Sequence, residues 1–218
     1  MADTQRQPVD LLVDPAVSSA KLEAEVALFR EREDEYRRRG CWLTRIAPPL
    51  VELVFAAPQL TPPAVVFGAR LDFTNFDFWP ASVQLVNPFT GDPYRFSELP
   101  TKLPQQAVGF RGADPPPELL AAIGALPGAQ LEIQYGPQAL MQAVEPDDIP
   151  FLCLRGVREY HENPGHSGDP WLLHRGTGRG SLIDLVEQLL KYGVAPLSGY
   201  AAQLAVRVVG LQQTEVPA

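Results

Sequence analysis

The three histidines of the chain, His161, His166 and His174, all follow Cys153 within one short segment. Thiolate and imidazole are the ligands that zinc prefers, so Cys153, His161 and His166, completed by His174 or Asp169, offer a tetrahedral zinc site. The spacing differs from that of a compact zinc module, because only His161 and His166 form a close pair. We therefore expect no cofactor at this cluster, with a bound zinc ion as the alternative.

The same residues suit thiol catalysis. Only a thiolate attacks, so a nucleophilic cysteine needs exposure, a nearby imidazole or cation that lowers its pKa, and donors for the developing oxyanion. Cys153 precedes a polar segment that carries Arg155, Arg158, His161 and His166. This composition predicts an electropositive setting and a lowered thiol pKa, with Cys153, His161 and His166 as the catalytic residues.

A purely structural role is also open for each of these residues. Leucines flank Cys153 on both sides, and free cysteine is among the most often buried residue types. The loop histidines would then only brace a turn. For Cys41, which stands beside Trp42 at the end of a predicted helix, we expect a place in the core.

The elements that must position this segment begin with a helix. Apolar residues at helical spacing predict a helix from about Ala20 to Arg39, with Gly40 as its stop. Short β-branched and aromatic runs between Cys41 and Pro93 predict an antiparallel meander of about four strands. In the third run, alternate residues are expected to face a helix: Val65, Phe67, Ala69, Leu71 and Phe73.

Prolines are dense in residues 94–148, and they exclude a long helix there because an interior proline costs about 3 kcal/mol. We expect a Pro-rich insertion over the surface of the same domain, with a separate small module as the alternative. Within it, one short helix is predicted at 118–126 and one short strand at 131–135.

The segment after the histidines predicts a capped amphipathic helix. Ser181 with Asp184 fits a capping pair, and Gly193 follows as a stop. An apolar stripe at helical spacing lies between them: Leu182, Leu185, Val186, Leu189 and Leu190. The sequence thus predicts an α+β fold: a partly ordered leader (1–18), a single domain (19–210), in which the Cys-bearing segment leads to C-terminal helices, and a tail (211–218).

The amino-acid composition limits the classes of partner that we expect this chain to bind. The formal net charge is -8 and the pI is near 4.9, which disfavours binding to nucleic acid or to an anionic membrane surface. No run approaches the roughly 20 apolar residues of a membrane span, and the first residues lack the pattern of a signal peptide. Two cysteines are too few for a disulfide framework. We therefore expect a cytoplasmic protein.

The order of these elements resembles that of the ubiquitin-conjugating enzyme family. The run FLCL is similar to the family's segment around its thioester cysteine, which maps onto Cys153. Residues 75–88, NFDFWPASVQLVNP, look like the family's proline-bracketed strand, and Trp171 with the helix SLIDLVEQLL resembles its Trp ahead of a helix. The match covers about residues 20–95 and 149–193 and looks like a divergent prokaryotic branch.

The resemblance implies a carrier enzyme that accepts a ubiquitin-like protein as a thioester on Cys153 from an adenylating enzyme, and passes it to an amine. The family's His-Pro-Asn motif, whose Asn supports the oxyanion, is absent before Cys153. This absence motivates the hypothesis that His161 or His166 replaces it. The resemblance also implies that the adenylating partner docks at the first helix, through Arg30, Arg37 and Arg38, although these cations also fit a solvated face. A noncatalytic scaffold or zinc module is the alternative function.

Overall fold

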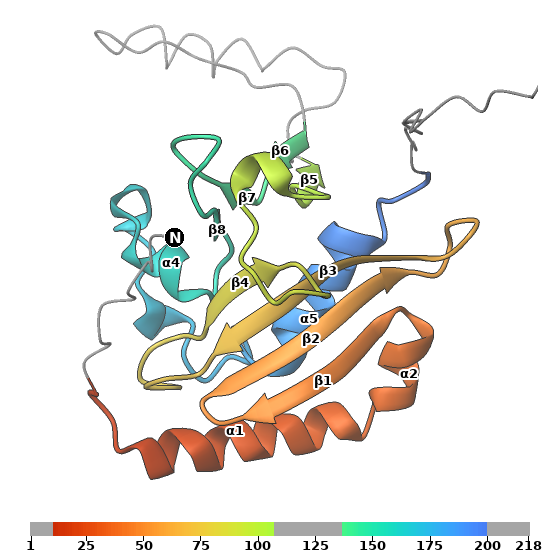
Figure 1. Ribbon diagram of the computed structural model, residues 1–218. Helices are drawn as coiled ribbons and strands as arrows, with labels where there is room; N and C mark the ends of the chain where they lie inside the picture. The colour runs from red at the N-terminus through yellow and green to blue at the C-terminus, as the bar shows by residue number, and fades with distance from the viewer. Residues whose placement is uncertain (1–10, 107–136, 200–218) are drawn as a thin grey trace, which may run out of the picture.

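Figure 1 shows the computed structural model, which describes residues 11–106 and 137–199. The described chain is α+β, as predicted: an N-terminal helix, a four-stranded antiparallel sheet in the order β1-β2-β3-β4, and C-terminal helices. The sheet consists of β1 (Cys41–Ala47), β2 (Leu50–Ala57), β3 (Ala64–Asp72) and β4 (Ser82–Val86). The predicted limits of the single domain extend beyond the described residues and stay a prediction.

The N-terminal helix begins earlier than predicted and is divided. Helix α1 spans Pro15–Arg30, because the Asp14 carboxylate accepts a hydrogen bond from the Ala16 N–H (2.8 Å) and proline suits the first helical position. A short second helix, α2 (Glu33–Arg38), follows the break. Gly40 ends it with a φ of 92°, as predicted, and a Cβ at this position would lie 2.1 Å from the carbonyl oxygen of Ala56.

One face of the sheet is buried, with one departure from the predicted alternation. Phe67, Ala69, Leu71 and Phe73 are fully buried, but Val65 is 46% exposed. The pairing of β2 with β3 shifts between Phe55 and Ala56, and such a bulge turns the following side chains to the other face. The prediction was therefore wrong for this one residue.

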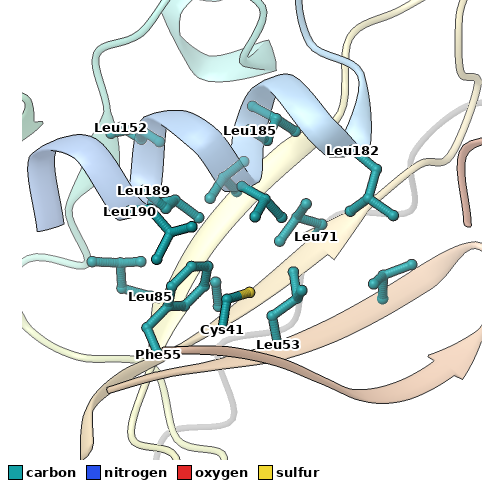
Figure 2. Close-up of a cluster of buried hydrophobic side chains, with 14 of the residues drawn as sticks. Cys41, Leu53, Phe55, Leu71, Leu85, Leu152, Leu182, Leu185, Leu189 and Leu190 are labelled. Carbon is teal, nitrogen blue, oxygen red and sulfur yellow. The ribbon is translucent and has the colours of Figure 1, made fainter. Parts of the chain in front are cut away.

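Helix α5 (Leu182–Leu189) covers the buried face of the sheet, and Figure 1 shows it behind the strands. The Ser181 hydroxyl accepts from the Asp184 N–H (3.1 Å), as the predicted cap requires. Figure 2 shows the leucines of α5 pointing toward the strand side chains, among which Cys41 is fully buried, as expected. The described core also includes Leu22, Val26 and Phe29 of α1.

Gly193 has another role than the predicted stop. The chain continues past α5 through η4 (Leu190–Val194). A Cβ on Gly193 would lie 2.8 Å from two ring carbons of Phe67, so glycine lets this turn approach the sheet closely.

The described parts of the Pro-rich insertion are joined to the same core. They comprise η1 (Phe96–Glu98), β5 (Pro104–Gln106), β6 (Pro137–Ala139) and β7 (Met141–Gln142), and Leu103, Leu140 and Met141 are buried. The helix expected at 118–126 and the strand expected at 131–135 lie outside the described residues. So do the first ten residues of the leader and the predicted tail.

Three short helices carry the segment between β8 (Phe151–Leu152) and α5: α4 (Arg158–Glu162), η2 (Pro164–His166) and η3 (Trp171–Leu173). Across residues 11–106 and 137–199, no helix combines the length and apolar character that crossing a bilayer requires.

The packing of α5 predicts a large loss of stability when it is truncated. Leu185 is fully buried, so Leu185→Ala should lower the free energy of unfolding by about 2–5 kcal/mol, through lost burial and a residual cavity. Leu28→Ala is the matched control, because Leu28 is 48% exposed on α1, and should change it by less than about 0.5 kcal/mol. Urea denaturation measures both, and equal effects would contradict this description of the core.

Candidate functional site

Cys153 is placed by a short antiparallel pair at the end of the insertion. Strand β7 pairs with β8, and the Cys153 N–H donates to the Leu140 carbonyl oxygen at 2.7 Å. Leu152 points into the core with 1% exposure, whereas the next side chain, Cys153, is half-buried and lines a cleft. The thiol is therefore open to a groove and not enclosed by its leucine neighbours.

The cleft has a volume of about 430 Å³ and is polar. Its walls come from β5, β6 and β7, from the segment that follows β8, from the loop that carries α4 and η2, and from the α5–η4 segment. Its charged lining residues, among those that the structure describes, are all basic. The lining consists of Gln105, Ala139, Leu140, Gln142, Cys153, Leu154, Arg155, Tyr160, His166, Arg179, Gln188, Lys191 and Tyr192.

His166 is the imidazole that reaches the thiol. Its Nε2 lies 3.2 Å from the Cys153 Sγ, within hydrogen-bonding distance. The Asn163 side chain caps η2 by accepting from the Gly165 N–H (2.9 Å), which fixes the turn that carries His166. The ring of Tyr160 stacks on the imidazole with a centroid distance of 4.0 Å and an interplanar angle of 17°. The sulfur thus has an imidazole nitrogen held beside it by a cap and by an aromatic stack.

The expected electropositive lowering of the thiol pKa is wrong. Burial raises the pKa of Cys153 above its ordinary value, and a hydrogen bond from the Gln142 side chain opposes this only in part. The Arg155 guanidinium turns to Asp169 (Nε–Oδ2 3.0 Å). Arg158 is buried and donates to the carbonyl oxygens of Pro80, Asp72 and Thr74. The arginines are therefore engaged elsewhere and do not lower the pKa of the thiol.

Gln142 is the site residue that the sequence analysis missed. Strand β7 places it in the same cleft, where its side chain opposes part of the rise in the Cys153 pKa, and its amide donates to the Ala139 carbonyl oxygen (3.5 Å). A side-chain amide beside the attacking atom is a suitable donor for a developing oxyanion. Nothing in the local sequence indicates this role, because the pairing of β7 with β8 brings Gln142 to Cys153 across the intervening turn.

His161 is engaged by the backbone on both ring nitrogens. Its Nε2 accepts from the Gly156 N–H (3.1 Å), and its Nδ1 donates to the Asp169 carbonyl oxygen (2.9 Å). Burial lowers the pKa of His161, which keeps the ring neutral. This geometry braces the loop around Cys153 and leaves His166 as the imidazole in contact with the thiol.

Asp169 connects the remaining polar groups. Its carboxylate accepts from the His174 Nε2–H (2.5 Å) and from the Tyr160 hydroxyl (2.8 Å), and pairs with Arg155. The hydrogen bond from His174 is the largest cause that lowers the pKa of this carboxyl group. Asp169 thereby holds the Tyr160 ring on which His166 stacks, and its backbone N–H also donates to the His166 carbonyl oxygen (2.9 Å).

The zinc alternative receives no geometric support within the described residues. There, no three His, Cys, Asp or Glu side chains come together as a metal-binding group. Cys153 and His166 are neighbours, whereas His161 is held by the backbone and His174 by Asp169. A zinc ligand set of Cys153, His161, His166 and His174 stays a prediction.

The arginines expected to bind a partner are exposed on α1 and α2. Arg37 pairs with Glu33 of its own helix (2.7 Å). Arg30 borders a separate hollow of about 640 Å³ between α1 and the β1–β2 turn, which Glu23 and Glu31 also line. Arg30, Arg37 and Arg38 therefore belong to a surface of mixed charge, and their role in binding stays a prediction.

Two similarities to known proteins cover the part of the chain that contains this site. A family model described as Y4jH-like matches residues 13–197. The uncharacterized protein y4jH of Sinorhizobium fredii (strain NBRC 101917 / NGR234) is 39% identical over 207 residues, which cover 91% of this chain and 93% of that protein. The family match includes Gln142, Cys153 and His166.

The raised thiol pKa predicts the alkylation behaviour of Cys153. Its rate of reaction with iodoacetamide should increase with pH and have a midpoint above about 8.5, the pKa of a free cysteine, because only the thiolate reacts. Buried Cys41, whose pKa is raised to about 12, should stay unlabelled in the folded protein. Peptide mass mapping measures both sites, and a midpoint for Cys153 below that of a free cysteine would indicate a preformed thiolate–imidazolium pair instead.

Proposed function

The chain belongs to the Y4jH-like family, and we propose that it is a thiol-dependent carrier enzyme of the ubiquitin-conjugating type. It accepts the C-terminus of a ubiquitin-like protein as a thioester on Cys153 and passes it to an amine. The observation that carries the proposal is the 3.2 Å contact between the Cys153 Sγ and the His166 Nε2 within an open cleft. The order of helix, four-stranded sheet, cysteine segment and helix supports it.

Loading proceeds by thiol exchange. The Cys153 S–H donates its proton to the His166 Nε2 while the sulfur attacks the thioester carbonyl carbon of the ubiquitin-like protein, held by the adenylating enzyme. The amide of Gln142, which lines the same cleft, is the donor for the oxyanion of the tetrahedral intermediate. When the intermediate collapses, the C–S bond to the adenylating enzyme breaks, and its departing thiolate takes the proton from His166. One thioester replaces another, so the protein has only to position the groups and stabilise the oxyanion.

Transfer of the acyl group from Cys153 to an amine uses the same side chains. An amine attacks the carbonyl carbon, a C–N bond forms, and the bond to the Cys153 sulfur breaks. The amine loses its proton to His166, which returns it to the sulfur. The half-buried thiol suits this cycle because its raised pKa keeps it protonated between turnovers, and His166 supplies the base at the moment of attack.

The proposal also includes a compartment and a docking surface for the adenylating enzyme. We place the reaction in the cytoplasm, where thiols stay reduced. The adenylating enzyme docks on the α1–α2 surface, where Arg30, Arg37 and Arg38 are exposed. Exposed ion pairs such as Arg37–Glu33 are weak enough to exchange partners.

The loading step can be tested with a glycine-terminated peptide thioester of mercaptoethanesulfonate. The wild-type protein should gain one acyl group that is removed by reductant, and Cys153→Ala should gain none. Cys153→Ser should form an ester that reductant leaves intact. His166→Ala should slow loading by about 10²–10⁴-fold through loss of the base, and Gln142→Ala by about 10²–10³-fold through loss of the oxyanion donor.

The matched control for Gln142 is Gln188→Ala. Gln188 lines the same cleft, but its amide donates to Asp184 of its own helix (3.3 Å), so loading should stay near the wild-type rate. Intact-mass kinetics measure every variant. Reducible loading of Cys153→Ala, or a wild-type rate for His166→Ala, would contradict the proposal.

A further inference from the structure

Lysine is scarce in this chain, and each lysine has a different environment. It occurs at three positions, Lys21, Lys102 and Lys191. Lys21 forms an ion pair with Asp77. The Lys102 ammonium lies 4.1 Å from the ring centroid of Phe96, outside the lining of the cleft. Lys191 is the lysine that lines the cleft of Cys153.

Lys191 is an exposed residue at the wall of the cleft. It lies in η4, directly after Leu190, whose side chain is 3% exposed and anchors this turn in the core. Its Nζ is 4.8 Å from the ring centroid of Tyr192, which is itself a lining residue. The amine therefore belongs to the α5–η4 wall, whereas the thiol belongs to the β7–β8 side of the same cavity.

The other cations of the lining cannot act as acceptors. Arg155 and Arg179 carry guanidinium groups, which stay protonated, and they are directed to Asp169 and Asp184. Lys191 is thus the primary amine among the described lining residues, and there it has no acidic partner.

We propose that Lys191 is an internal acceptor of the acyl group carried by Cys153. This inference rests on the proposed function. Once its ammonium has lost one proton to solvent, the Lys191 Nζ attacks the carbonyl carbon of the Cys153 thioester, a C–N bond forms, and the C–S bond breaks. The amine proton passes through His166 to the Cys153 sulfur, so the thiol is regenerated and the acyl group becomes an amide of Lys191.

Two physical reasons favour this transfer. Two groups held in one cavity of about 430 Å³ react without the entropic cost of bringing an outside amine to the site. An amide is also more stable than a thioester. The product keeps the acyl chain in the cleft, so self-acylation closes the site to further loading whenever no outside amine arrives first.

The experiment follows the full-length protein with the glycine-terminated peptide thioester of mercaptoethanesulfonate. Intact mass with and without reductant separates thioester from amide, and peptide mapping locates the amide. In the wild-type protein, a reducible adduct on Cys153 should appear first and decline as a reductant-resistant adduct grows on Lys191. Lys191→Arg keeps the charge but lacks the nucleophile, so the reducible adduct should persist and the resistant one should fall at least about tenfold. Lys102→Arg, the matched control, should behave as wild type.

Each other outcome overturns the inference. A resistant adduct that persists in Lys191→Arg, or that maps elsewhere, removes Lys191 as the acceptor. An unchanged rate at Lys191 in Cys153→Ala shows direct attack of the lysine on the probe. A stable thioester on Cys153 without amide at Lys191 overturns this inference alone and leaves the proposed function standing, whereas no thioester at all counts against both.

Discussion

The burial of leucine side chains from two segments in one core determines the geometry of the cleft. Leu152 immediately precedes Cys153, and Leu185, Leu189 and Leu190 precede the part of η4 that lines the cavity; all four are 3% exposed or less. Each contributes about 1.5–3 kcal/mol of burial. Movement of one wall relative to the other would expose these side chains, so their burial keeps the width of the cleft.

Within that frame, the proposed chemistry depends on a protonated thiol next to a base. Burial raises the pKa of Cys153, and the arginines nearby form ion pairs with Asp169 and Asp184 or hydrogen-bond to backbone carbonyls. A protonated thiol resists oxidation and unwanted alkylation, because the thiolate is the reactive form. In the proposed mechanism, the imidazole of His166, which stacks on Tyr160, takes the thiol proton only when a substrate is in the cleft.

Local sequence patterns were sufficient for most of the fold. The four strands, the Ser181 cap and the apolar stripe of α5 follow from periodicity and capping chemistry, which act over a few residues. The bulge that turns Val65 outward and the close approach of Gly193 to Phe67 depend on neighbouring elements, and a single segment does not encode them. The earlier start of α1 was available from Asp14-Pro15, a cap followed by proline.

The site was predictable only in part for the same reason. The clustering of Cys153 with three histidines identified the segment, but not which imidazole reaches the sulfur. Both ring nitrogens of His161 hydrogen-bond to the backbone, and His174 donates to Asp169. His166 is the histidine whose ring contacts the sulfur. Gln142 reaches Cys153 through strand pairing, and the fold buries Arg158 and removes it from the cleft.

The central claim is that the Nε2 of His166 accepts the proton of Cys153. Long-range ¹H–¹⁵N imidazole spectra of the ¹⁵N-labelled protein report which ring nitrogen carries a proton. The account predicts that neutral His166 is protonated on Nδ1, with an Nε2 shift that changes when Cys153 is replaced by Ala. A His166 that carries its proton on Nε2, with an Nε2 shift unaffected by that replacement, would contradict it.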